Sequence, residues 1–137
     1  MKLNPAVAAG SPTIRALVVD DYRDAAESLA RMLETMGCRA NFVTDPKAAM
    51  EAATAMDVQI VFIDIGMPAI NGFELAEMFR ARYGQNIRLV AVTAYGGTAI
   101  QLKCRDAGFD CHVLKAVDSG AFRQTLDGFF LAARCGT

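Results

Sequence analysis

The sequence predicts an α/β fold in which one parallel sheet of five strands is covered on both faces by five helices. Three observations predict it. Short apolar runs alternate strictly with longer stretches of helical periodicity, and a return to a parallel strand requires such a crossover. The first, third and fourth runs are apolar nearly throughout, as strands buried on both faces are. No repeat or linker interrupts the 137 residues, so we expect a single domain.

Each expected strand is a run of seven residues rich in apolar side chains. The runs occupy residues 14–20, 38–44, 58–64, 87–93 and 109–115. The expected helices occupy residues 22–37, 45–56, 71–84, 98–108 and 118–134. Asp45 caps the second helix and Pro46 takes its first position. Asn71-Gly72 turns the chain into the third helix.

Two helices show their expected buried face directly in the spacing of apolar residues. The face of the first helix is formed by Ala25, Leu29, Met32, Leu33 and Met36, before a natural stop at Gly37. The face of the third helix is formed by Phe73, Leu75, Ala76 and Phe79. Both faces should pack on the sheet.

Composition excludes several classes of protein. Apolar residues make up 53% of the chain and the formal net charge is −1, which argues against wholesale disorder and against a protein built mainly to bind nucleic acid. No apolar run approaches the ~20 residues of a membrane span. Residues 1–13 read as a flexible lead-in, too weak for a secretory signal, and residues 14–134 as the folded domain. We expect a cytoplasmic protein that contacts neither nucleic acid nor membrane.

The four cysteines, Cys38, Cys104, Cys111 and Cys135, are scattered along the chain. None forms a CxxC pair, and the only histidine, His112, is adjacent to just one of them. A disulfide set or a zinc site is the less favoured interpretation, because ligand spacing and a secretory signal are both missing. Reduced, mostly packed thiols are expected.

Polar residues close all five expected strands, and at the end of the second, Thr44-Asp45 indicates only a helix cap. Asp20 and Asp21 end the first, Asp64 the third, Thr93 the fourth and Lys115 the fifth. Each alone is ordinary, since such residues commonly cap helices, form turns or lie in solvent. Together they should meet, because ligands of an open α/β sheet bind at the carboxyl ends of its strands.

Three clustered carboxylates repel one another unless a cation lies among them. Oxygen ligands of this kind suit Mg²⁺, and the ion and Lys115 together could hold a phosphoryl group while Thr93 donates a hydrogen bond to it. A carboxylate can accept the group as an acyl phosphate. Asp64 is the best candidate, because it ends the central strand.

These residues occur in motifs that resemble the receiver domain of response regulators in two-component signalling. The motifs are VVDD (18–21), FIDIGMPAINGFELA (62–76), AVTAY (91–95) and VLK (113–115). The resemblance covers about Ile14 to Phe130 and implies the flavodoxin-like receiver fold with strand order 2-1-3-4-5. It fits a stand-alone domain or part of a hybrid histidine kinase.

The resemblance also implies roles for the site residues. Asp64 would be phosphorylated by a histidine kinase or a histidine phosphotransfer protein in a phosphorelay. Mg²⁺ would be held by Asp20, Asp21, Asp64 and the backbone carbonyl of Gly66. Thr93 and Lys115 would bind the phosphoryl oxygens. Such a domain is a phosphoacceptor with slow autodephosphorylation, not a turnover enzyme, and we expect a monomer or weak dimer.

Signalling in such domains shifts an existing equilibrium between two conformations. Thr93 and the residue at the strand-five switch position, here His112, would move. The surface of the fourth helix, fifth strand and fifth helix would then meet a downstream protein. Tyr95 and Met67, together with Gly66, are expected to flank the site and influence access to it.

Two departures from the family pattern leave alternatives open. Ala116 follows Lys115 where the family usually has a cis proline, so a trans bond is expected there. His112 replaces the usual Tyr or Phe, either as a half-buried ring in the same slot or as a pH-sensitive switch.

A pseudo-receiver that only docks proteins is therefore the alternative. A dehalogenase-type phosphatase would need a second Asp at Gly66, and a flavin site would not suit the acidic loop after the first strand.

Overall fold

The computed structural model describes residues 13–67, 71–94, 97–115, 124 and 127–128. Its strands are β1 (Arg15–Val19), β2 (Arg39–Val43), β3 (Ile60–Asp64), β4 (Arg88–Thr93) and β5 (Cys111–Leu114). Its helices are α2 (Arg23–Thr35), the short 3₁₀ helix η1 (Pro46–Ala48), α3 (Ala49–Met56), α4 (Gly72–Tyr83) and α5 (Thr98–Ala107). The predicted helix 118–134 lies almost wholly outside the described residues.

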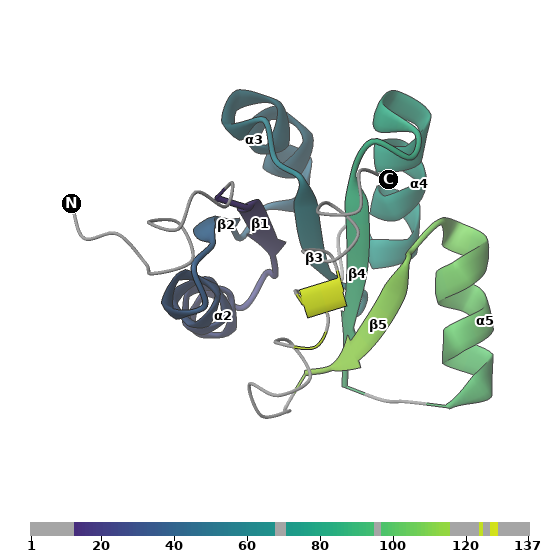
Figure 1. Cartoon of the computed structure of the whole chain (residues 1–137). Coiled ribbons are helices and arrows are strands. Elements are labelled where there is room, and N and C mark those ends of the chain that lie inside the picture. Colours follow the sequence, from purple (N-terminus) through teal and green to yellow (C-terminus); the bar gives the residue numbers. More distant parts are fainter. Residues whose placement is uncertain (1–12, 68–70, 95–96, 116–123, 125–126, 129–137) are drawn as a thin grey trace.

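The five strands form one parallel sheet in the order β2-β1-β3-β4-β5, which confirms the predicted fold and strand order. In register, Val19 of β1 lies beside Ile63 of β3, and Asp64 lies beside Val92 of β4. The residues that follow β1 and β3 therefore leave the sheet side by side. They do so at the lower edge of the sheet in Figure 1.

Apolar side chains pack on both faces of the sheet, as the continuous apolar strands predict. Helix α2 covers one face, where Ala26, Ala30 and Leu33 pack against strand residues such as Phe62. Helices α3, α4 and α5 cover the other face (Figure 1). Burial on both faces explains why β3 is buried at all five of its positions. The strand that carries Asp64 is thus enclosed on both faces.

The buried face of α2 matches the predicted one in part. Ala26, Ala30 and Leu33 are its buried residues, whereas Leu29, Met32 and Met36 are half-buried and pack against the same core. The predicted stripe followed the largest apolar residues of the helix. Two alanines at the centre instead let the helix lie close to the sheet, and the longer side chains reach down beside them.

The second predicted helix starts as a 3₁₀ turn. Asp45 Oδ1 accepts a hydrogen bond from Lys47 N at 2.9 Å, which confirms the predicted cap. The Ala48 amide then donates to Asp45 O at 2.9 Å, the i to i+3 bond of a 3₁₀ helix. The α-helix proper therefore begins only at Ala49. For α4, by contrast, the predicted face is confirmed, with Leu75, Ala76 and Phe79 fully buried.

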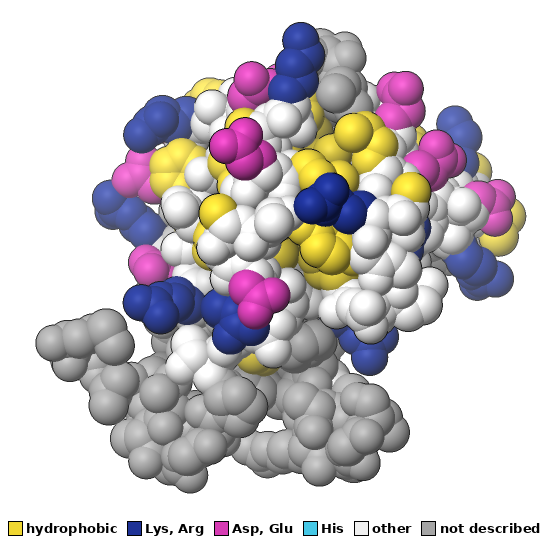
Figure 2. Space-filling model, turned by 90° about the horizontal axis from the view of Figure 1, so that it is seen from above, with side chains coloured by type: hydrophobic (Ala, Val, Ile, Leu, Met, Phe, Trp, Pro, Cys, Tyr) yellow, Lys and Arg dark blue, Asp and Glu magenta, His cyan; other side chains and the backbone are white. Residues whose placement is uncertain are grey.

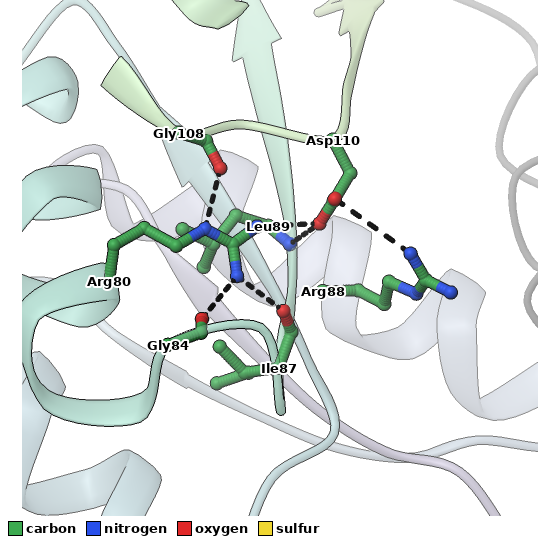
Figure 3. A network of polar contacts seen from close by, with 7 residues as sticks. All are labelled: Arg80, Gly84, Ile87, Arg88, Leu89, Gly108 and Asp110. Atoms are coloured by element: carbon green, nitrogen blue, oxygen red, sulfur yellow. Dashed lines mark hydrogen bonds and ion pairs between the residues drawn. The ribbon is translucent and has the colours of Figure 1, made fainter. Parts of the chain in front are cut away.

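At the edge of the sheet opposite the strand carboxyl ends, Arg80 joins four carbonyl and carboxylate groups (Figure 3). Its guanidinium donates to Gly108 O, Gly84 O and Ile87 O, each at 2.7 Å, and to Asp110 Oδ2 at 2.8 Å. Asp110 Oδ2 also accepts from the Leu89 amide at 2.8 Å. Gly108 has φ +107° and lies against the Arg80 stem, so a side chain would be strained there. The end of α4, the start of β4 and the turn into β5 are therefore held by one side chain.

Figure 2 looks onto this same edge, from above the view of Figure 1. Basic and acidic side chains are interspersed over it, with apolar surface between them. Across the described residues, no helix has the length and apolar character that a membrane crossing requires.

We predict that Arg80→Ala lowers the free energy of unfolding by about 3 kcal/mol, because it leaves enclosed carbonyls and a carboxylate without their donor. Urea unfolding at pH 7 measures the loss. The control is Arg31→Ala in α2, whose side chain is 75% exposed and pairs with Glu27 at 2.7 Å. That exposed pair contributes about 0.5 kcal/mol or less. Equal losses in the two variants would contradict the assigned role of Arg80.

Candidate functional site

Two acidic side chains are buried at the carboxyl edge of the sheet. Asp64 is the last residue of β3 and Asp20 follows β1, the neighbouring strand. The Asp64 side chain is 8% exposed and that of Asp20 is 6% exposed. Carboxylates are rarely buried to this degree without a partner. The sequence predicted both at this edge, and the structure brings them together.

Lys115, which follows β5, supplies the partner for both acids. Its Nζ lies 2.9 Å from Asp64 Oδ2 and 3.1 Å from Asp20 Oδ2. The backbone fixes where this lysine starts, since its amide donates to Thr93 O at 2.6 Å across β4 and β5. One ammonium therefore neutralises part of the charge of two buried carboxylates.

The remaining oxygens of the two acids accept backbone hydrogen bonds. Asp64 Oδ1 accepts from the Gly66 amide at 3.0 Å, and Asp20 Oδ1 accepts from the Tyr22 amide at 3.0 Å. Each acid is thus held by the chain two residues after it, the geometry of an Asx turn. These bonds fix the carboxylate directions before any ligand arrives.

Burial, neighbouring charges and hydrogen bonds shift the pKa values of Asp20 and Lys115. Burial raises the pKa of Asp20, and the charge of Asp64 raises it further, although the Tyr22 amide and Lys115 oppose this. Burial lowers the pKa of Lys115, but its hydrogen bonds to Asp64 and Asp20 and their charges together outweigh this and raise it. The ammonium is therefore charged throughout the physiological pH range.

Asp21 completes an acidic cluster. One carboxylate oxygen from each of Asp20, Asp21 and Asp64 lies within 4.8 Å of the others, and Asp21 is exposed. Opposite ligands of one Mg²⁺ are about 4.2 Å apart, twice its usual bond to oxygen, so the cluster is close to the size that this ion requires. Among the described residues this is the only group of three or more potential metal ligands. A hard divalent cation fits both the donor type and the spacing.

Gly66 lies beside the Asp64 carboxylate. A Cβ atom at this position would be 3.5 Å from Asp64 Oδ1, ordinary van der Waals contact. The absence of a side chain leaves space next to Asp64 Oδ1. Met67, expected to influence access to the site, is 3% exposed and packs in the core on the side of α3, α4 and α5.

Two other predicted site residues, Thr93 and His112, lie on β4 and β5. Thr93 ends β4 and is 3% exposed. His112 is half-buried on β5 and pairs in register with Ala91. Tyr95 and the Lys115–Ala116 bond fall outside the described residues. Thr93 and Lys115 are joined through the backbone bond described above, so β4 and β5 meet at the site.

The three cysteines within the described residues form no part of this cluster. Cys38 and Cys104 are free and buried, and Cys111 is exposed. Burial raises the pKa of Cys38 to about 11 and also raises that of Cys104. These two thiols are protonated packing residues at neutral pH, as expected, and Cys135 lies outside the described residues.

One residue of the site region was read from the sequence only as part of a turn. Asn71-Gly72 was expected to lead the chain into its helix, and Asn71 Oδ1 does cap α4 by accepting from the Glu74 amide at 2.9 Å. Gly72, however, is buried directly against the backbone of Asp64 and Ile65. A glycine at the first turn of a helix, rather than a better helix former, was the signal in the sequence.

Comparison with known proteins gives the family. The model of the response regulator receiver domain matches residues 16–127. Curated relatives include the hybrid signal transduction histidine kinase L of Dictyostelium discoideum, 29% identical over 119 residues, and the virulence sensor protein BvgS of Bordetella bronchiseptica, 32% identical over 121 residues. These matches cover 82% and 84% of this chain but 7% and 10% of the relatives. The chain thus spans a small part of the length of the kinases that it matches.

Solved structures agree on the fold. A CheY-like response regulator receiver domain from Methylobacillus flagellatus is 27% identical with a TM-score of 0.75, and the match covers 85% of this chain and 98% of that one. The chemotaxis protein CheY4 of Vibrio cholerae has a TM-score of 0.78 at 18% identity, with the same coverage of both chains, and supports the fold alone. With the family match, the strand order and the clustered acids, the chain belongs to the response regulator receiver domains.

Proposed function

We propose that this domain accepts a phosphoryl group on Asp64 in a two-component phosphorelay. The observation that carries the proposal is the contact of one ammonium, Lys115 Nζ, with the two buried carboxylates of Asp64 and Asp20, beside the exposed Asp21. Such a site combines a nucleophile with positive charge, which phosphoryl transfer requires. The donor would be a phosphohistidine of a histidine kinase or of a histidine phosphotransfer protein.

In this proposal Asp20, Asp21, Asp64 and the Gly66 carbonyl hold Mg²⁺. The ion supplies charge neutralisation for the phosphoryl oxygens when it is bound. Asp21 is exposed, so it is the ligand that an arriving ion meets first. The acids at residues 20 and 64 are fixed by the Tyr22 and Gly66 amides and need little rearrangement.

An Asp64 carboxylate oxygen attacks phosphorus and forms a new O–P bond. The P–N bond of the donor breaks, and its electron pair stays on the imidazole nitrogen. The histidine leaves as a neutral imidazole after proton exchange with water. The Lys115 ammonium, 2.9 Å from Asp64 Oδ2, would then bind the negatively charged phosphoryl oxygens. Thr93, buried at the end of β4, would turn its hydroxyl toward them. The product acyl phosphate would hydrolyse slowly, so the domain is a signalling phosphoprotein and not a turnover enzyme.

The signal would leave through α5, β5 and the predicted helix 118–134. Thr93 and Leu114 are partners in the β4–β5 register, and His112 lies on the same strand as Leu114. Movement of Thr93 would therefore shift the neighbouring residues of β5. Leu102 of α5 is 49% exposed and Leu114 is 43% exposed, which suits a surface that meets a downstream protein. We place this exchange in the cytoplasm, with the domain as a monomer or weak dimer that contacts neither nucleic acid nor membrane.

We predict that Asp64→Asn abolishes phosphorylation, because an amide oxygen is too weak a nucleophile. The protein is incubated with Mg²⁺ and acetyl phosphate and weighed intact. The wild type and the control Asp45→Asn, which keeps its helix cap, should each gain one phosphoryl group. The gain should vanish without Mg²⁺. No gain in any sample would replace the proposal by a pseudo-receiver, and steady release of phosphate from phosphomonoesters would indicate a phosphatase.

Mg²⁺ at ten times its dissociation constant should raise the free energy of unfolding by about 1.4 kcal/mol, since it binds only the folded acidic cluster. Asp21→Asn should remove most of this gain, because it deletes the exposed ligand. Asp106→Asn, an exposed acid of α5 away from the cluster, is the control and should keep the gain. Thermal unfolding at increasing Mg²⁺ measures it, and full stabilisation of Asp21→Asn would place the ion elsewhere.

Lys115→Met should lower the metal-free free energy of unfolding at pH 7 by about 1 kcal/mol, because two buried carboxylates lose their cation and the lysine is partly screened by water. The direction of the pH dependence follows from Asp20. The pKa of Asp20 is raised in the folded state, so above the ordinary value of 3.8 its ionised carboxylate lowers the free energy of unfolding.

Without the ammonium this cost grows, so the deficit of Lys115→Met should be largest at neutral pH and shrink as the pH falls through the raised pKa of Asp20. Urea unfolding between pH 4 and 8, at roughly one-unit steps and with EDTA present, tests this. The control is Lys103→Met, an exposed lysine of α5. A deficit that does not change with pH would show that Lys115 acts only through packing.

A further inference from the structure

Gly72, the first residue of α4, lies against the backbone that carries Asp64. A Cβ atom at Gly72 would be 2.5 Å from Ile65 Cα, 2.9 Å from Asp64 O and 2.9 Å from Ile65 Cγ2. Carbon atoms in contact are ~3.5–4.0 Å apart, so even a methyl group does not fit. Two of the three atoms belong to the backbone and cannot turn aside as a flexible side chain would. The start of α4 and the end of β3 meet directly because residue 72 has no side chain.

Both sides of this contact are held in place. The Ile65 amide donates to Val92 O at 3.1 Å, which ties the chain leaving β3 to β4. On the other side, α4 is anchored by Leu75 and Phe79, which are 0% exposed, and by the Asn71 cap. The Asp64–Ile65 backbone is therefore confined between β4 and the first turn of α4.

A side chain at residue 72 would displace Asp64 and Ile65 rather than α4. Ile65 is half-buried and lies beyond the last residue of β3, whereas α4 is fixed by core side chains along its length. Relief of the closest contact needs a shift of about 1 Å. The same shift would disturb the 2.9 Å contact of Asp64 Oδ2 with Lys115 and the bond of Asp64 Oδ1 to the Gly66 amide.

We propose that Gly72 is a positioning residue for the reaction of Asp64: its close contact with the Asp64–Ile65 backbone sets where the carboxylate stands relative to Lys115 and the other acids. The inference rests on the proposed phosphoacceptor function. A displacement of about 1 Å at a reacting group can reduce a rate by roughly a hundredfold, so the contact is large enough to matter.

The test is Gly72→Ala, with Gly84→Ala as its matched control at the other end of α4. Gly84 has φ +60° and nothing within 4 Å of an added Cβ, so alanine there strains the backbone without touching the site. Gly72→Ala should slow Mg²⁺-dependent phosphorylation by acetyl phosphate by roughly 10- to 100-fold and weaken Mg²⁺ binding, measured by calorimetry, by roughly tenfold. Gly84→Ala should retain the wild-type rate and affinity.

Rates are divided by the folded fraction from circular dichroism, so that lost stability is not counted as lost positioning. Ile65→Ala added to Gly72→Ala removes Cγ2, one of the three contacting atoms, and should recover part of the rate. Wild-type rate and Mg²⁺ affinity in folded Gly72→Ala, or equal losses in Gly84→Ala, would overturn the proposal. If the wild type accepts no phosphoryl group, the proposed function fails, and the Mg²⁺ affinities alone decide the role of Gly72.

Discussion

Two almost completely buried carboxylates share one ammonium, and the carboxyl edge of the sheet is organised around that contact. Asp20 and Asp64 are brought together because β1 and β3 are neighbours in the parallel sheet. Their separate burial would be costly, and their mutual repulsion adds to the cost. Lys115 offsets both, which makes β5 part of the acidic site although it lies at the far edge of the sheet.

The sequence was sufficient for the strands, for their order once the family resemblance was recognised, and for the residues at the strand ends. Strand ends are readable because each apolar run stops at a polar residue, and the parallel topology brings these ends to one edge. Thr93 and Lys115 were placed correctly at this edge for that reason. Their chemical roles remain predictions, since position alone does not show what a side chain binds.

Other features depend on packing that no periodic pattern records. The buried line of α2 runs through Ala26 and Ala30 because small residues decide how closely a helix approaches a sheet. Met67 looked like a residue of the site by its position in the sequence but turns into the core. Gly72 was predicted only as a turn residue. Its packing role depends on the atoms opposite it, and these belong to Asp64 and Ile65, in another part of the chain.

The Arg80 network gives the domain unequal resistance to local opening at its two edges (Figure 3). The carboxyl end of α5 is held through Gly108 and Asp110, whereas the amino end of α5 begins at Gly97 with no side-chain cap. Opening of α5 should therefore start at its amino end, next to the loop after Thr93, and stop before Gly108. Amide hydrogen exchange along this helix should therefore become slower from its amino end toward Gly108.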